Sequence, residues 1–202
     1  MAQQSETIAL PKPSLTGSTS LEALLAKRRC IREYLVTTLK LAEIGQLLWA
    51  AQGITHPQGY RTAPSAGALY PLQLYLVVRA LQDLAPAVYG YDPDQHHLVW
   101  MQEGDRRNLL ASAALGQEWL ANAAAIVVFT ADYKRTTHKY GQHGKRYVHM
   151  EAGHAAENLF LQANALDLTT VIVGAFDEEE VANVLGLTTQ EQPLILMPIG
   201  RK

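Results

Sequence analysis

Three arginines lie within five positions of the sequence, at Arg28, Arg29 and Arg32. Guanidinium groups bind phosphate through charge-assisted and often bidentate hydrogen bonds, so this cluster suits a small phosphate-bearing ligand. A solvated basic turn would have the same composition, because cations are favoured near the C-terminal end of a helix. These residues alone leave both interpretations open.

A second stretch, Arg61 to Pro71, consists mainly of small residues, and Ala63 to Ala68 contains only alanine, glycine, serine and proline. No branched side chain would keep a flat or charged ligand away from the backbone, and Ser65 and the backbone amides can donate hydrogen bonds. A connecting loop without a ligand can have the same composition. The two-residue hydrophobic period of Leu72 to Val78 predicts a strand directly after it.

Other candidate chemistry is weaker. Glu151 and His154 have the Glu-x-x-His spacing of di-iron bundles, but such sites need two of these motifs and further carboxylates, so we predict no metal. Cys30 is the only cysteine, which excludes an internal disulfide and a thiolate metal cluster. The chain has neither a Gly-x-Gly-x-x-Gly motif nor a Walker loop, so a Rossmann dinucleotide site and a P-loop are unsupported.

The bulk composition restricts the class of protein. The 202 residues are 48% hydrophobic and 18% charged, as in a globular domain, and the net charge of -2 argues against a nucleic-acid binder. No secretory signal opens the chain, and the longest apolar run, Ala123 to Phe129, is too short to span a bilayer. We therefore expect a cytoplasmic protein that binds neither nucleic acid nor membrane.

The elements that must position these residues follow from hydrophobic periodicity and capping signals. Residues 1–18 are expected to form a polar arm, and residues 19–202 the folded domain. The polar segment Asp132 to Gly144 is expected to be a loop over a cleft, followed by a long helix from Lys145 to Leu166. Helices and strands do not alternate regularly, which favours an α+β fold. Further helices are predicted after Thr19, after Thr38, from Arg106 to Ala114 and from Asp177 to Gly186, and further strands at 88–91, 97–100, 125–129, 169–173 and 194–199.

Taken together, these motifs show a resemblance. The run from Arg28 to Arg32 resembles the opening signature of FMN-dependent nitroreductases. The run from Pro64 to Pro71 is similar to the loop of one branch, the SagB-type dehydrogenases, which include azoline oxidases of peptide natural-product pathways. The resemblance covers Leu21 to Lys202, and its other motifs are Lys139-Tyr140-Gly141, Arg146-Tyr147, Glu151-Ala152-Gly153-His154, Asn158-Leu159 and Gly174-Ala175-Phe176.

The resemblance implies a three-layer α+β sandwich with a central, mostly antiparallel sheet flanked by helices. It also implies a homodimer that binds FMN between its subunits and acts on a small-molecule or peptide-derived substrate. Lys139 and Tyr140 would assist proton removal beside hydride transfer. Alternatives are a nitro or quinone reductase using NAD(P)H, and a flavin- or partner-binding module without turnover. The cofactor-binding residues implied are Arg28, Arg29, Cys30, Arg32, Pro64, Ser65, Ala66, Ala68, Ile172, Val173, Gly174, Ala175 and Arg201.

Overall fold

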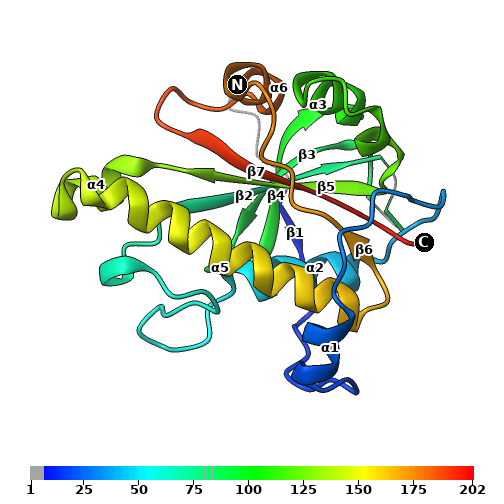
Figure 1. Ribbon diagram of the computed structural model, residues 1–202, viewed down its shortest axis with the longest axis horizontal. Helices are drawn as coiled ribbons and strands as arrows, with labels where there is room; N and C mark the ends of the chain where they lie inside the picture. The colour runs from blue at the N-terminus through cyan, green and yellow to red at the C-terminus, as the bar shows by residue number, and fades with distance from the viewer. Residues whose placement is uncertain (1–6, 80, 83) are drawn as a thin grey trace.

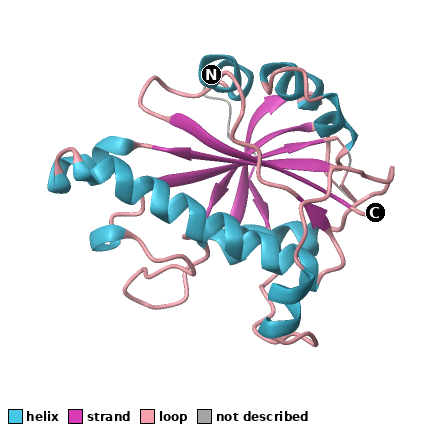
Figure 2. Ribbon diagram, viewed as in Figure 1, coloured by secondary structure: helices cyan, strands magenta, loops and turns pink. Residues whose placement is uncertain are grey.

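The computed structural model describes residues 7–79, 81–82 and 84–202. Its centre is a seven-stranded sheet with the strand order β1-β4-β3-β2-β5-β7-β6, in which every pair of neighbours is antiparallel (Figures 1 and 2). The strands are β1 (Thr7–Ala9), β2 (Leu72–Val78), β3 (Ala87–Asp92), β4 (His97–Glu103), β5 (Ala125–Ala131), β6 (Thr169–Thr170) and β7 (Gln192–Gly200).

Both faces of the central strands are buried, because alternate side chains of a strand point to opposite sides of the sheet. In β2, Leu74 and Leu76 pack into one hydrophobic core, and Tyr75 and Val77 pack into the other. The alternation expected after the small-residue loop is therefore confirmed. It places the loop at the start of β2, one of the three innermost strands of the sheet.

Helices cover the two faces and complete three layers (Figure 1). Helices α2 and α5 pack on the first core, and α3 and α6 pack on the second. The predicted caps of α6 are confirmed, since the Asp177 side chain accepts from the N–H of Glu180 and Gly186 ends the helix with a left-handed φ of 65°. The helices are α1 (Leu21–Lys27), α2 (Leu41–Gln52), α3 (Arg107–Ala113), α4 (Tyr133–Tyr140), α5 (His143–Ala165) and α6 (Glu178–Leu185), with short 3₁₀ turns η1 (Ala66–Ala68) and η2 (Glu118–Asn122).

Four local predictions differ from the structure. The strand expected at 169–173 is only the two-residue β6, followed by a single bridge between Val173 and Leu196. The N-cap of α1 is Ser20 rather than Thr19, and α2 begins at Leu41, three residues after Thr38. The segment expected to be a loop, Asp132 to Gly144, contains helix α4 and the start of α5. The Asp132 side chain caps α4 by accepting from the N–H of Lys134. A residue that we interpreted as part of a loop is therefore the N-cap of a helix.

The α+β class and the three-layer sandwich are confirmed. The N-terminal segment adds strand β1, which pairs with β4 at the edge of the sheet. Among the described residues, no helix has the length and apolar character needed to cross a membrane.

Candidate functional site

The loop that begins at Arg61 has an unusual backbone. Gly67, Ala68 and Tyr70 have φ angles of 64°, 54° and 46°, all in the left-handed region. Glycine adopts this region at no steric cost, whereas alanine and tyrosine do so only when their surroundings enforce it. The sharp turn exposes the backbone of Gly67 and Ala68 at the surface of the molecule.

Polar contacts hold this turn. The Ser65 hydroxyl accepts from the N–H of Tyr70 at 2.9 Å, and the Tyr70 hydroxyl accepts from the N–H of Arg61 at 3.1 Å. The Arg61 guanidinium lies over the Tyr70 ring, 4.6 Å from its centroid. From α5, the Asn158 amide donates to the carbonyl of Thr62 at 3.3 Å. The loop is therefore fixed from within and by the long helix.

Helix α4 brings Lys139 and Tyr140 to this loop. A Cβ placed on Gly67 would lie 2.7 Å from the Tyr140 hydroxyl oxygen and 3.1 Å from Lys139 Nζ. The Arg135 side chain of the same helix donates to the carbonyl of Tyr70 at 3.2 Å, which ties α4 to the loop a second time. A Cβ at position 67 would require these side chains to move, so two motifs about 70 positions apart in the sequence meet there.

A buried polar cluster lies behind the loop. Glu151 of α5 is 2% exposed, and Gln52 of α2 is 1% exposed. Arg61 donates to the Gln52 side-chain oxygen at 2.8 Å. Burial raises the pKa of Glu151 to about 7, while a hydrogen bond from Ser65 and the positive charge of Arg61 act in the opposite direction. Burial also lowers the pKa of Arg61.

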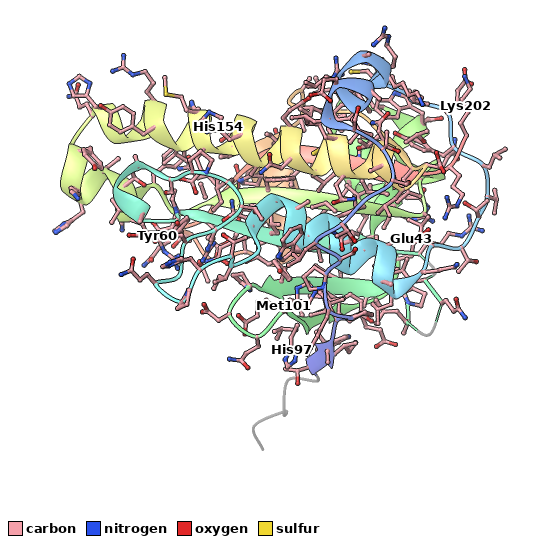
Figure 3. The ribbon with its side chains drawn as sticks, turned by 90° about the horizontal axis from the view of Figure 1, so that it is seen from below. Glu43, Tyr60, His97, Met101, His154 and Lys202 are labelled. Carbon is pink, nitrogen blue, oxygen red and sulfur yellow. The ribbon has the colours of Figure 1, made fainter. Side chains whose placement is uncertain are left out.

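The sequence did not reveal this cluster as part of a site. Arg61 stood out only as the one charge of its stretch, and Glu151 only as half of a Glu-x-x-His spacing. The structure separates that pair, because Glu151 is buried and His154 is exposed on the outward side of α5 (Figure 3). Within the described part of the chain, no group of three His, Cys, Asp or Glu residues could hold a metal.

The arginine cluster lies beside β6, an edge strand of the sheet. The N–H of Ile31 donates to the carbonyl of Thr170, and the N–H of Leu35 donates to the carbonyl of Arg201. Arg29 and Arg32 are exposed, as is Cys30 between them. The segment from Arg28 to Leu35 is thereby held beside both β6 and Arg201.

Each of the implied phosphate-binding arginines already has a contact within the chain. Arg29 donates to the carbonyls of Ala26 and Arg28, and Arg32 lies over the ring of Trp119. Arg28 lies 3.6 Å from the carboxylate of Glu157 and over the ring of Phe160, and Arg201 pairs with Glu43 at 2.5 Å. An exposed ion pair stabilises by only about 0–1 kcal/mol, so the Arg28–Glu157 pair costs little to open for a phosphate.

The turn after β6 contributes backbone amides. Val173 exchanges two backbone hydrogen bonds with Leu196, both of 2.9 Å, and its N–H is therefore used. For the N–H groups of Gly174 and Ala175, no protein acceptor is found in the described part of the chain. These two residues are exposed, as is Ile172, so the turn presents free donors at the same edge as the arginines.

The implied site residues therefore form separate groups. Pro64, Ser65, Ala66 and Ala68 lie with Lys139 and Tyr140 beside the N-terminal half of α5, whereas the segment with Arg28 to Arg32 lies beside β6 and Arg201, on the other side of the molecule (Figure 1). The 172–175 turn follows β6 on the way to α6. Figure 3 shows the same separation, with Tyr60 on one side and Lys202 on the other.

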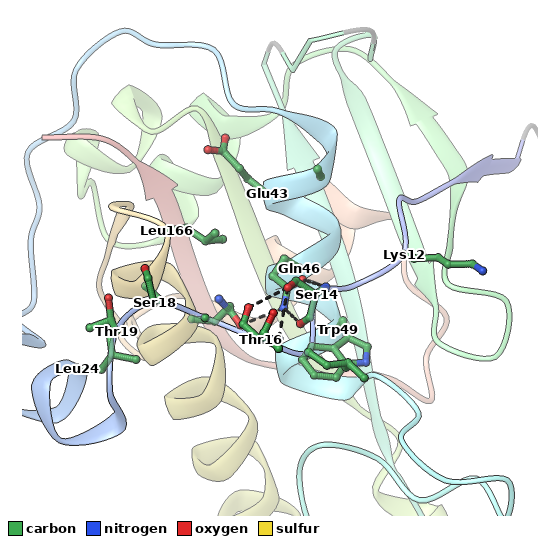
Figure 4. A pocket seen from close by; sticks show the side chains of 15 residues that line it. Lys12, Ser14, Thr16, Ser18, Thr19, Leu24, Glu43, Gln46, Trp49 and Leu166 are labelled. Carbon is green, nitrogen blue, oxygen red and sulfur yellow. Dashed lines mark hydrogen bonds between the residues drawn. The ribbon is translucent and has the colours of Figure 1, made fainter.

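One cavity, with a volume of about 600 Å³, lies between the N-terminal segment, α1, α2 and α5 and is lined by none of the implied site residues (Figure 4). There the Gln46 side chain bonds to both the N–H and the carbonyl of Ser14, at 2.8 and 3.0 Å, and so pins the N-terminal segment to α2. Glu43, the ion-pair partner of Arg201, lies in its wall.

Comparison with known proteins identifies the family. Residues 25–201 match the profile of the Nitroreductase family. A curated protein of Methanocaldococcus jannaschii, whose name assigns it to the nitroreductases, is 46% identical over 182 residues, covering 90% of this chain and 91% of its own.

Solved structures agree with that family. A protein of Ralstonia eutropha, also assigned as a nitroreductase, is 29% identical and superimposes with a TM-score of 0.86, covering 99% of this chain and 91% of its own. The NADPH:FMN oxidoreductase of Vibrio harveyi, solved with NAD+, is 20% identical with a TM-score of 0.63 over 88% of this chain and 66% of its own, and shows the shared fold. The chain belongs to the nitroreductase family of oxidoreductases.

Proposed function

We propose that the protein is an FMN-dependent oxidoreductase of the SagB-type dehydrogenase kind, a cytoplasmic homodimer that oxidises a small-molecule or peptide-derived substrate. The observation that carries this proposal is the meeting of Lys139 and Tyr140 with the small-residue loop at Gly67. These are two of the motifs on which the resemblance to the SagB-type branch rests, and the fold brings them together. A binding module without turnover has no need of this arrangement.

The donor set fits FMN. Exposed Arg29 and Arg32, with Arg28 beside them, offer guanidiniums to a phosphate. Gly174 and Ala175 offer two free N–H groups, which suit the polar edge of a flavin ring. The loop from Pro64 to Ala68 presents small side chains, so a flat ring can approach its backbone closely.

The separation of the two groups supports a dimer with a shared cofactor site. Leu21 and Leu25 of α1 are 57% and 53% exposed, and Met150 of α5 is 53% exposed. Gly153 lies on the same outward side of α5, with no heavy atom within 4 Å of a Cβ built on it. Exposed apolar side chains, and a small residue on the outward side of a long helix, suit close packing against a second copy.

Each group would have a distinct task. FMN supplies the hydride-transfer chemistry when bound. The arginines hold its phosphate, and the 172–175 turn donates hydrogen bonds to its ring. The 64–68 loop covers one face and excludes water there. Lys139, in its neutral amine form, would accept the proton of the substrate at Nζ, and the Tyr140 hydroxyl beside it would orient that amine.

A titration of the apoprotein with FMN tests the proposal. FMN fluorescence should be quenched on binding, and FAD should bind more weakly. Arg28→Ala should weaken FMN binding by about 1.5–3 kcal/mol, the scale of a hydrogen bond to a charged group. Arg79→Ala, which removes an exposed arginine at the end of β2, should have no effect. A wild-type protein that neither carries nor quenches FMN would refute the proposal.

One observation favours a second candidate, reduction of a nitro compound or quinone with NAD(P)H. From Tyr133 to Met150 the chain contains five lysines and arginines and no aspartate or glutamate, although acidic residues outnumber basic ones overall, 19 to 17. Lys134, Lys145 and Arg146 are exposed on this hairpin, next to Lys139, and suit the phosphates of a dinucleotide. Lys145→Ala with Arg146→Ala should then raise the KM for NADPH and leave FMN affinity unchanged.

A further inference from the structure

Arg32 differs from the other two arginines of its cluster in what its guanidinium group contacts. Arg28 lies beside the carboxylate of Glu157, and Arg29 donates to two backbone carbonyls. Arg32 has neither a hydrogen-bond acceptor nor a carboxylate partner within the described part of the chain. Its guanidinium carbon instead lies over the indole ring of Trp119, 5.7 Å from the ring centroid. All five N–H donors of Arg32 are therefore available to a ligand.

A guanidinium group can contact an aromatic ring and an anion at the same time. Its flat face is attracted to the face of an indole ring, whereas its N–H bonds lie in its own plane and point away from the ring. The contact with Trp119 therefore holds the Arg32 group in place without using a donor. A side chain that is already held loses less conformational entropy on binding, so it binds a phosphate more tightly.

Trp119 is itself fixed by its neighbours in η2 and beyond. Leu120, the next residue, is fully buried. The Gln117 side chain donates to the carbonyl of Ala175 at 3.1 Å, which ties the start of η2 to the 172–175 turn. The ring of Tyr34 stacks on the indole, with the ring centroids 6.5 Å apart and the ring planes at 26°. The indole is thus in contact with the segment that carries Arg32 through two side chains.

Tyr34 joins the indole to the end of the sheet. Its hydroxyl donates to the carbonyl of Ile31 at 2.9 Å, which closes the segment around Arg32 into a turn. A Cβ placed on Gly200, the last residue of β7, would lie 2.7 Å from Cδ1 of the Tyr34 ring. Only because position 200 has no side chain can the ring lie there. Residues from three distant parts of the chain therefore converge on Arg32.

We propose that Trp119 is the positioning residue of Arg32, and that Arg32 contributes more than the other arginines of its cluster to binding an organic phosphate. This inference rests on the proposed function, in which that phosphate belongs to FMN. The indole holds the face of the guanidinium group and leaves its N–H edge to the phosphate oxygens. Through Gln117, the same η2 segment is bonded to the turn that offers backbone amides to the flavin ring.

The first test needs no cofactor. The ring current of an indole shields nuclei over its face, so the Nε–H proton resonance of Arg32 in the apoprotein should lie upfield of that of Arg29. Trp119→Leu should remove this shift, and Trp119→Phe, which keeps an aromatic face, should retain part of it. An Arg32 resonance that Trp119→Leu does not move would contradict the inference without any measurement of FMN.

The second test measures FMN affinity. Arg32→Ala should weaken FMN binding about 100-fold, more than Arg28→Ala does, at the upper end of the scale for hydrogen bonds to a charged group. Trp119→Leu should weaken it about fivefold and Trp119→Phe about twofold, the scale of a cation–π contact at an exposed site. The Arg32→Ala, Trp119→Leu double variant should bind no more weakly than Arg32→Ala alone. Trp100→Leu, which removes a half-buried tryptophan of β4, is the matched control and should bind FMN as the wild type does.

The outcomes separate the two proposals. A wild-type protein that binds no FMN defeats the proposed function and the phosphate-binding role of Arg32, while the Arg32 resonance still decides whether Trp119 holds this side chain. If FMN binds but Trp119→Leu lowers only the melting temperature, Trp119 merely packs η2, and the inference is wrong while the proposed function stands. Additive losses in the double variant, or a larger loss in Arg28→Ala than in Arg32→Ala, would also overturn it.

Discussion

Replacing Glu151 by Gln should change how the stability of the protein depends on pH. The ordinary pKa of the side chain is 4.5, and burial raises it to about 7 in the folded protein. The folded state therefore binds the proton more tightly than the unfolded state does. The stabilisation that comes from the proton on Glu151 is complete below pH 4.5. It is lost as the pH rises through the pKa of the folded protein, about 7.

The size of the effect follows from the shift. A difference of about 2.5 pKa units at about 1.36 kcal/mol per unit gives about 3 kcal/mol in total, of which about 2.5 kcal/mol falls between pH 5 and pH 8. The Glu151→Gln variant cannot ionise and lacks this loss. Its stability should therefore increase relative to the wild type as the pH rises.

Urea unfolding at pH 5, 6, 7 and 8 measures this difference. With an m-value of about 2 kcal/mol/M, the midpoint of the variant relative to the wild type should rise by about 1.2 M across that range. Glu103→Gln, at an exposed position, should follow the wild-type profile. A wild-type-minus-variant difference that stays flat within about 0.5 kcal/mol would show that the Glu151 carboxyl is not buried in a way that opposes its ionisation.

Three further results are expected from the candidate site. Replacing Lys139 and Tyr140 together by Ala should leave FMN content intact and reduce substrate oxidation about 100-fold, the scale of a lost general base. Full activity of the double variant would show that the pair has no catalytic role. Gly67→Ala and Gly59→Ala place alanine at φ angles of 64° and 81°, and each should lower the free energy of unfolding in urea by about 1 kcal/mol. Only the alanine at position 67 also meets Tyr140, so only Gly67→Ala should lower turnover, about tenfold. Met150→Glu puts a charge on the exposed side of α5 and should yield monomers that lose FMN, as light scattering with absorbance would report; a monomer that keeps FMN would rule out a shared site.

The sheet and most helices were predictable because their signals are local. The two-residue period of β2 and the Asp177 and Gly186 caps of α6 are each fixed by a few neighbouring residues. The α+β class followed from the order of such elements. Boundaries were weaker, as the choice between Thr19 and Ser20 for the α1 cap illustrates, because both side chains can accept the same kind of hydrogen bond.

Helix α4 was missed because its stability is tertiary rather than local. The sequence there is polar, and Gly141 and Gly144 were interpreted as loop residues. In the structure, Gly141 ends α4 with a φ of 53°, and Gly144 lets α5 approach the backbone of Thr137, where a Cβ would lie 2.8 Å from its Cα. The two glycines therefore mark a tight helix–helix turn. Thr136, 1% exposed, shows that the helix packs on the body of the protein.

The burial of Glu151 illustrates what a sequence cannot supply. The Glu-x-x-His spacing puts two polar groups on one side of a helix, but the rotation of α5 decides which of them is buried, and that rotation is set by the whole core. Once Glu151 faces inward, burial raises the pKa of its carboxyl to about 7, so the protonation of this residue is a consequence of the whole core and not of its local spacing.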